Sequence, residues 1–236
     1  MKRFNAIFFD LDDTLCDWQE ARRWGIEAAH TLIAREHPEI SLATFKTTFD
    51  SVSTEMFAEW SKFTRPSAKL RLERSRRILA QLGLNKKDSL ADEATDVFFD
   101  HAIANLKLFD DVSATLESLR SSYVLGLITN TLADVQWIKI RKLGLDRILN
   151  HILIASEVGV SKPDPIIFQR ALATAKVRAD QFLFVGNSLE DDVAGAKAAR
   201  VSSVWLNRNG ARAPESLQPD FEIRSLRELA SLIATA

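Results

Sequence analysis

The pattern of apolar residues after position 108 is the strongest constraint on the fold of this chain. From Leu108 to the C-terminus, short apolar runs alternate with longer stretches of helical periodicity. The apolar runs predict buried strands at residues 124–128, 152–154, 182–185 and 204–206. Helices are predicted between or after them, at residues 112–120, 135–143, 166–176, 191–199 and 225–233. Alternation of this kind indicates an α/β fold, in which helices cover both faces of a parallel sheet.

A helical block interrupts this pattern. The first predicted strand, residues 5–9, is separated from the others by a segment that is rich in helix formers and charge, nearly free of glycine, and without a convincing strand. Four helices are predicted there, at residues 18–36, 41–61, 66–82 and 89–105. The simplest interpretation is an all-helical cap domain of residues 17–105, inserted into a core domain of residues 1–16 and 106–236.

Composition narrows the class of protein. The 31 basic and 32 acidic residues give a net charge of -1, so there is no electrostatic case for nucleic acid or an anionic membrane as partner. Cys16 is the only cysteine, which excludes an internal disulfide and favours a reducing compartment. No apolar run is long enough to span a bilayer, and none resembles a signal peptide. We expect a cytoplasmic protein. Small molecules are the class of ligand that its composition leaves open, and its sequence does not indicate an oligomeric state.

The first predicted strand ends in a cluster of acidic residues. Asp10, Asp12 and Asp13 occupy three of four positions, followed by Thr14. Carboxylates repel one another and cost several kcal/mol each to desolvate unpaired, so the cluster needs a cation or a chemical purpose. Asp10 and Asp12 point the same way, since they lie two apart on an extended strand. A polar turn that caps the next helix explains the cluster alone equally well.

Polar residues also follow the next two predicted strands, where α/β sheets bind their ligands. Thr129 and Asn130 supply a hydroxyl and an amide before a helix whose free N–H groups suit an anion. Lys162 precedes Asp164 and Pro165, which fit the N-cap and first residue of a helix, so the lysine is expected on the loop that faces the strand ends. A turn and a solvated surface lysine are the structural alternatives.

The fourth strand is followed by a further polar loop. Gly186, Asn187 and Ser188 fit a tight turn, and Ser188 with Asp191 fits a capping box, which gives Asp191 mainly a structural role. Asp192 follows. Polar residues suited to one site occur by chance at all four strand ends much less often than at a single strand end. Together these residues describe carboxylates for a divalent metal, a hydroxyl, an amide and an ammonium around one anionic group.

In this order the motifs resemble those of the haloacid dehalogenase-like (HAD) hydrolases, in the phosphatase branch that carries a helical cap after the first motif. The similarity covers essentially the whole chain. The four motifs correspond to Asp10-Leu11-Asp12-Asp13-Thr14, Thr129-Asn130, Lys162, and Gly186-Asn187-Ser188 with Asp192. The resemblance implies a Rossmann-like core and magnesium-dependent phosphoryl transfer to or from a small phosphorylated metabolite.

The resemblance also implies roles for these residues. Asp10 would attack a phosphomonoester and form an aspartyl-phosphate, and Asp12 would protonate the leaving alcohol and then accept a proton from water. Lys162 and Thr129 would stabilise charge on the transferring phosphoryl group. The phosphate-binding residues would be Thr129, Asn130 and Lys162, with Thr14 and Ser188 in support.

The implied cofactor is Mg²⁺, a cation that prefers oxygen ligands. By resemblance its ligands are the Asp10 carboxylate, the Asp12 backbone carbonyl, Asn187 and Asp192. The family more often has aspartate where this chain has Asn187. An amide oxygen carries no formal charge, so metal affinity is expected to be lower unless Asp192 compensates.

Three alternatives share this fold. A 2-haloacid dehalogenase has no use for a second acid at Asp12 or for a metal-binding fourth motif, whereas a phosphomutase would use the same core. An inactive binding or scaffold protein is the alternative outside enzymes. Specificity is expected in the cap, which leaves phosphorylated sugars, phosphoglycolate, nucleoside monophosphates and phosphorylated cofactors as candidate substrates. One predicted cap helix is strongly basic, which is typical of a solvated face with local ion pairs and less often of an anion-binding site. Its basic residues are Lys69, Arg71, Arg74, Arg76 and Arg77.

Overall fold

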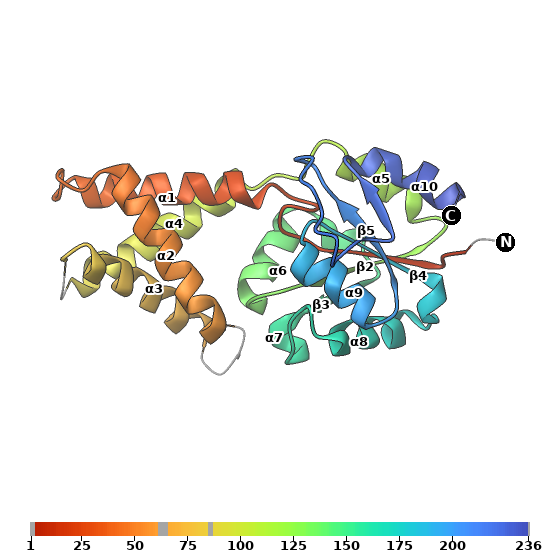
Figure 1. Cartoon of the computed structure of the whole chain (residues 1–236). Helices are drawn as coiled ribbons and strands as arrows, with labels where there is room; N and C mark the ends of the chain where they lie inside the picture. The colour runs from red at the N-terminus through yellow and green to blue at the C-terminus, as the bar shows by residue number, and fades with distance from the viewer. Residues whose placement is uncertain (1–2, 61–65, 85–86, 236) are drawn as a thin grey trace. The chain divides into compact units, whose positions relative to one another are not determined.

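The computed structural model describes residues 3–60, 66–84 and 87–235. It contains two compact units. The core comprises Met1–Asp17 and Leu108–Ala236, and the cap comprises Trp18–Lys107 (Figure 1).

The core is built on one sheet of six strands, all parallel, in the order β3-β2-β1-β4-β5-β6. The strands are β1 (Ala6–Phe9), β2 (Val124–Thr129), β3 (His151–Ile154), β4 (Phe182–Gly186), β5 (Ser202–Leu206) and β6 (Phe221–Ile223). Every residue of β1 is buried and pairs on both sides, with β2 and with β4. A strand buried on both faces is a continuous apolar run, as the sequence of β1 is.

Helices cover both faces of this sheet. Figure 1 shows α5 (Val112–Leu119) and α10 (Leu229–Thr235) on one side and α8 (Pro165–Ala175) on the other. The remaining α-helices of the core are α6 (Ala133–Lys142), α7 (Ala155–Val158) and α9 (Ala194–Ala198). Single turns complete the core at η1 (Leu145–Arg147), η2 (Ala179–Gln181), η3 (Leu189–Val193) and η4 (Leu226–Glu228). The predicted α/β fold with a parallel sheet is confirmed.

Two predicted core helices differ from the structure in detail. The helix predicted at 191–199 is divided into η3, a π-helical turn, and α9. The helix predicted at 225–233 begins as the 3₁₀ turn η4 before α10. Both irregular turns follow a serine whose side chain accepts a backbone N–H, Ser188 and Ser225. Strand β6 and the short helix α7 were not predicted.

The cap consists of the four helices α1 (Trp18–Ala34), α2 (Leu42–Trp60), α3 (Ser67–Gln81) and α4 (Asp88–Asn105). The predicted end of the second helix, Ser61, lies outside the described residues. Helices α1 and α4 approach closely at Gly25, where a Cβ atom would lie 2.5 Å from the carbonyl oxygen of Phe98. The glycine therefore permits this helix pair to pack at backbone distance.

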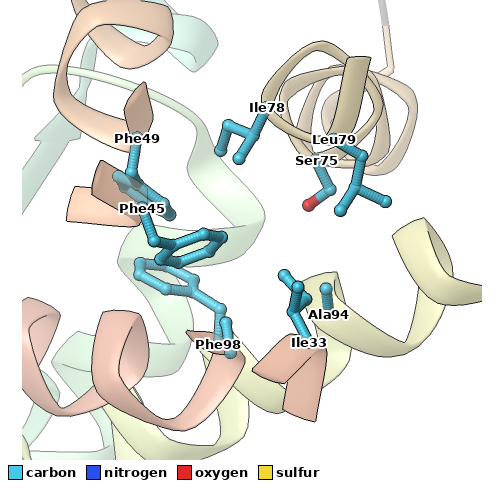
Figure 2. Close-up of a pocket in the computed structure, with 9 residues that line it drawn as sticks. Ile33, Phe45, Phe49, Ser75, Ile78, Leu79, Ala94 and Phe98 are labelled. Atoms are coloured by element: carbon cyan, nitrogen blue, oxygen red, sulfur yellow. The ribbon is translucent and has the colours of Figure 1, made fainter. Parts of the chain in front are cut away.

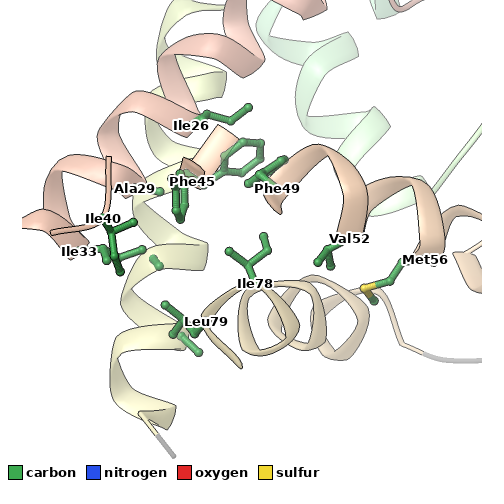
Figure 3. Close-up of a cluster of buried hydrophobic side chains, with 13 residues drawn as sticks. Ile26, Ala29, Ile33, Ile40, Phe45, Phe49, Val52, Met56, Ile78 and Leu79 are labelled. Carbon is green, nitrogen blue, oxygen red and sulfur yellow. The ribbon is translucent and has the colours of Figure 1, made fainter. Parts of the chain in front are cut away.

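The cap has its own apolar interior, which Figure 3 shows between the helices. This interior contains a small cavity of about 10 Å³. Figure 2 shows Phe45, Ile78 and Phe98 among the side chains around it. The polar group that lines it, the hydroxyl of Ser75, lies 2.6 Å from that of Thr95. The cavity is about the size of one water molecule, so we interpret it as a gap in core packing.

The basic residues of α3 divide into two groups. Arg76 pairs with Asp88, and Arg77 pairs with Glu59 and Glu73, as a solvated face would. Arg74 instead points inward and is only 5% exposed.

No helix formed by residues 3–60, 66–84 or 87–235 is long and apolar enough to cross a membrane.

Candidate active site

The site is built around the loop that follows β1, at the point where the strand order of the sheet reverses. Because β1 lies between β2 and β4, the loops after these three strands emerge side by side. The N–H of Asp10 donates to the carbonyl of Val185 at 2.9 Å and so extends the strand pairing by one residue. The chain then turns at Asp13, whose φ of 63° lies in the left-handed region that aspartate tolerates better than most residues.

A buried lysine joins two carboxylates at the centre of this arrangement. The Nζ of Lys162 lies 2.6 Å from an oxygen of Asp10 and 2.6 Å from an oxygen of Asp192, and its side chain is only 2% exposed. The other oxygen of Asp192 accepts the N–H of Ser188 at 2.9 Å. Gly186 permits this arrangement, because a Cβ there would overlap the Asp192 carboxylate.

Burial and charge act on these groups in opposite directions. Burial alone would lower the pKa of the Lys162 ammonium, but the charges of Asp10 and Asp192 outweigh it and raise that pKa above its usual range. Burial raises the pKa of Asp10 to about 7, since lost solvation and the Asp192 charge outweigh the attraction of Lys162. Two carboxylates face one ammonium, so negative charge is in excess here.

Asn130 holds the loop that carries Lys162. Its Nδ2 donates to the carbonyl of Lys162 at 3.0 Å, and its Oδ1 accepts the N–H of the same residue at 2.8 Å. Asp164 caps α8 by accepting the N–H of Ile166 at 2.9 Å, with Pro165 as the first helical residue, as the sequence predicts. The side chain of Asn130 thus orients the lysine.

Thr14 joins the loop after β1 to the loop after β4. Its hydroxyl donates to Oδ1 of Asn187 at 3.0 Å and accepts the N–H of that residue at 3.1 Å. Trp205, which sequence reasoning did not single out, donates its indole N–H to the Asn187 carbonyl at 2.9 Å. Ser188 caps the following turn by accepting the N–H of Asp191 at 3.0 Å, which is one half of the predicted capping box. The Asp191 side chain instead accepts from Nδ2 of Asn130 at 3.5 Å. Thr14, a fully buried residue, therefore fixes the position of Asn187.

Asp12 contacts two side chains from helix α6 that sequence reasoning missed. The Nζ of Lys139 lies 2.9 and 3.0 Å from the two carboxylate oxygens of Asp12. The Nε2 of Gln136 donates to Asp12 at 3.0 Å and to the Thr129 hydroxyl at 2.6 Å. The sequence did contain a signal, since Gln136 and Lys139 share a helix face with buried Ile140.

The structure thus brings the predicted residues together in three contacts. Asp10 and Asp192 meet at Lys162, Thr14 meets Asn187, and Asp12 is linked to Thr129 through Gln136. The arrangement places a buried carboxylate, a second carboxylate two residues further on, and an ammonium that can attract an anion at one edge of the sheet.

The residues at the site fit a magnesium ion in their chemistry. In the described part of the chain, no three Asp, Glu, His or Cys side chains form a metal-binding cluster. The predicted ligands are the carboxylates of Asp10 and Asp192, the amide of Asn187 and the backbone carbonyl of Asp12. All four offer oxygen atoms, which Mg²⁺ prefers as ligands. Burial, together with the charge of Asp192, raises the pKa of Asp10, and a divalent cation bound there would favour the ionised carboxylate.

Comparison with known proteins gives consistent relatives. A family model described as haloacid dehalogenase-like hydrolase matches residues 7–206. The glyceraldehyde 3-phosphate phosphatase of Methanopyrus kandleri is 30% identical over 97% of this chain and 96% of its own length. The N-acylneuraminate-9-phosphatase of Mus musculus is 30% identical over 99% of this chain and 95% of its own length.

A solved structure agrees with these relatives. The 2-haloacid dehalogenase from Pseudomonas syringae pv. Tomato DC3000 has a TM-score of 0.75 and 32% identity, over 98% of this chain and 99% of that chain. The family model covers most of the chain. The resemblance inferred from four short motifs and the prediction of a hydrolase are both confirmed: the chain belongs to the haloacid dehalogenase-like hydrolases.

Proposed function

We propose that this hydrolase is a phosphatase for small phosphomonoesters that works through a covalent intermediate on Asp10. A carboxylate oxygen of Asp10 attacks phosphorus, the bond from phosphorus to the ester oxygen breaks, and Asp12 gives its proton to the departing alkoxide. Water then attacks the phosphorus of the aspartyl-phosphate and gives a proton to Asp12. Inorganic phosphate leaves, and Asp10 is again a free carboxylate.

One observation carries this proposal. The ammonium of Lys162 is buried at the carboxyl end of β1, 2.6 Å from the carboxylate that would attack. A phosphoryl group bound to Asp10 would therefore have a desolvated cation beside its oxygens, where charge stabilisation is most effective. Thr129, also buried, would supply a hydroxyl from the neighbouring strand end. Asn130 would act through its hold on the Lys162 loop.

Mg²⁺ would be held by Asp10, Asp192, Asn187 and the Asp12 carbonyl. When bound, it would supply positive charge that neutralises the substrate phosphate. Asn187 is expected to bind Mg²⁺ most weakly of the three side chains, because it is the uncharged one. Thr14 would orient the amide oxygen of Asn187 toward the site.

Dehalogenation is the second candidate, because one structural neighbour with 32% identity is a 2-haloacid dehalogenase. That chemistry needs a carboxylate nucleophile and no proton donor for a departing halide. Asp12, held by two side chains of α6, has a use in phosphate ester hydrolysis and none in halide release. The names of the two relatives at 30% identity also favour phosphate chemistry.

The test is phosphate release from p-nitrophenyl phosphate by the purified full chain with Mg²⁺, followed by a panel of soluble phosphometabolites. EDTA is expected to abolish activity and added Mg²⁺ to restore it. Asp10→Asn is expected to reduce kcat/KM by at least about 10³. Wild type that is as inert as Asp10→Asn on every phosphate ester would refute the proposal, and chloride release from 2-chloropropionate would favour the dehalogenase.

The metal ligand set has a separate test. Asn187→Asp adds a charged oxygen ligand, so the Mg²⁺ concentration for half-maximal activity is expected to fall. Asn209→Asp, at an exposed loop position, is the control for adding one negative charge. An unchanged Mg²⁺ requirement in Asn187→Asp would remove residue 187 from the ligand set.

A further inference from the structure

Helix α6 presents two polar side chains to the interior of the core. Gln136 is fully buried and Lys139 is 2% exposed. They lie three residues apart and so on the same face of the helix. Burying an ammonium costs several kcal/mol before any partner is counted.

The carboxylate of Asp12 is where both side chains converge. Lys139 contacts both of its oxygens, at 2.9 and 3.0 Å, and Gln136 contacts one of them at 3.0 Å. The side chain of Asp12 is itself 23% exposed. A carboxylate that is 23% exposed keeps part of its solvation and does not itself require a buried cation, whereas the buried Lys139 ammonium does require a partner. The buried lysine is therefore better explained by the need to hold Asp12 in one orientation.

Gln136 links this orientation to the neighbouring loop. The same Nε2 atom lies 2.6 Å from the Thr129 hydroxyl and 3.1 Å from the Asn130 carbonyl. Its Oε1 is buried without a hydrogen-bond partner among the described residues. A glutamine buried at such cost ties the side chain of Asp12 to the loop after β2.

We propose that Lys139 and Gln136 are positioning residues that aim the Asp12 carboxyl group at the leaving-group oxygen. This inference rests on the proposed phosphatase function, in which Asp12 donates a proton to that oxygen. In this role both residues act through Asp12 and not through contact with the substrate. Both act by fixing the rotamer of Asp12. Their loss should therefore slow the reaction most for esters whose leaving group is basic and depends on protonation.

The test compares two esters of nearly the same shape, phenyl phosphate and p-nitrophenyl phosphate. The phenolate is the more basic leaving group and depends more on a proton donor. The quantity to follow is the ratio of kcat/KM for phenyl phosphate to that for p-nitrophenyl phosphate. This ratio reports the transfer to Asp10 and is insensitive to hydrolysis of the intermediate.

Lys139→Met is expected to lower this ratio by roughly tenfold, toward the value in Asp12→Asn. A tenfold fall is a part of the ~10²–10⁴ that general acid catalysis contributes in full. The double variant Lys139→Met with Asp12→Asn should lose no more than Asp12→Asn alone, because both changes act on one step. Lys142→Met, on an exposed position of the same helix, is the matched control and should leave the ratio unchanged.

A ratio that stays at the wild-type value in Lys139→Met, with both esters slowed equally or not at all, would overturn the inference. If Lys139→Met does not fold, as judged by circular dichroism, Gln136→Leu takes its place with the same expected fall and the same refuting result. A wild type that hydrolyses neither these esters nor any phosphate ester of the metabolite panel would refute the proposed phosphatase itself, which is a distinct outcome.

Discussion

The core and the cap bury their cations in different surroundings. In the core, Lys162 contacts two carboxylates and Lys139 contacts both oxygens of a third. In the cap, Arg74 is surrounded by aromatic rings, and its Nε and Nη2 have no hydrogen-bond partner within residues 3–60, 66–84 and 87–235. The guanidinium carbon lies 4.6 Å from the centroids of both Phe49 and Phe98 and 5.5 Å from that of Trp60.

The difference shows in the pKa values of the two cations. Paired carboxylates raise the pKa of Lys162 despite its burial. Burial, with the nearby charges of Arg22 and Arg71, lowers the pKa of Arg74 to about 9, so it is still a cation at neutral pH. Carboxylates compensate for desolvation fully and aromatic faces do so only in part. We infer that the buried cations of the core hold carboxylates in place, whereas the buried Arg74 of the cap mainly fills space between aromatic rings.

Lys162→Met gives the largest expected effect. The change leaves Asp10 and Asp192 buried without their shared cation, and breaking a buried pair in this way costs about 3–5 kcal/mol. Activity is expected to fall by at least about 10², since a donor to the phosphoryl group is lost. Urea unfolding in EDTA would measure the first effect, and p-nitrophenyl phosphate turnover the second.

Lys197→Met, at an exposed position of α9, is the control for this change. If the free energy of unfolding of Lys162→Met lies within about 1 kcal/mol of that of this control, the stability of the core does not depend on the buried ion pairs of Lys162.

Asp111 extends the comparison to a core carboxylate away from the site. It accepts hydrogen bonds from Arg208 at 2.8 and 2.9 Å, from the Ser225 hydroxyl at 2.8 Å and from the Leu226 N–H at 2.9 Å. Burial alone would raise the pKa of Asp111, but these hydrogen bonds and the Arg208 charge outweigh it and lower the pKa to about 2. The folded state therefore binds this proton less readily than the unfolded state.

Asp111→Asn is expected to cost about 2 kcal/mol at neutral pH, because a pKa shift of one unit corresponds to about 1.4 kcal/mol. The contribution of a carboxylate with a lowered pKa is complete above the unfolded pKa of about 4 and is lost as pH falls toward the folded value. The difference in Tm between wild type and variant should therefore narrow between about pH 5 and pH 3. Asp110→Asn, exposed and adjacent, is the control, and a gap of constant size would contradict the assignment.

The strands and their polar ends were predictable because β1, β2 and β4 are continuous apolar runs, each followed by polar residues. The edge strand β6 was not, since it has three residues and pairs on one side alone. Its sequence, Phe221-Glu222-Ile223, does not differ from that of many loops. A strand that is buried on both faces is a continuous apolar run and can be recognised in the sequence, whereas a short edge strand has no such pattern.

The partners of Asp12 illustrate a second limit. Lys139 stands 127 positions away in the sequence, on a helix where a lysine is ordinarily solvated. Arg74 is a similar case, because nothing in the basic run of α3 distinguishes it from Arg76, which pairs with Asp88 at the surface. The fate of a charged side chain depends on which distant element packs against it. Local sequence can place Lys139 on the same helix face as Ile140, but it does not identify Asp12 as the partner.

Arg74→Met gives the smallest expected effect and the sharpest contrast with Lys162→Met. Methionine is apolar, similar in length and favourable against aromatic rings, so it should keep the packing around Phe49 and Phe98. It also removes the desolvation of a guanidinium with two unpaired nitrogen atoms. These gains oppose the lost cation–π attraction of about 2 kcal/mol at a desolvated site. Urea unfolding should therefore place Arg74→Met within about 1 kcal/mol of wild type or above it, since exchange of a buried ion for an apolar residue is often neutral or stabilising. A loss as large as that in Lys162→Met would mean that the cap, like the core, depends on its buried charge.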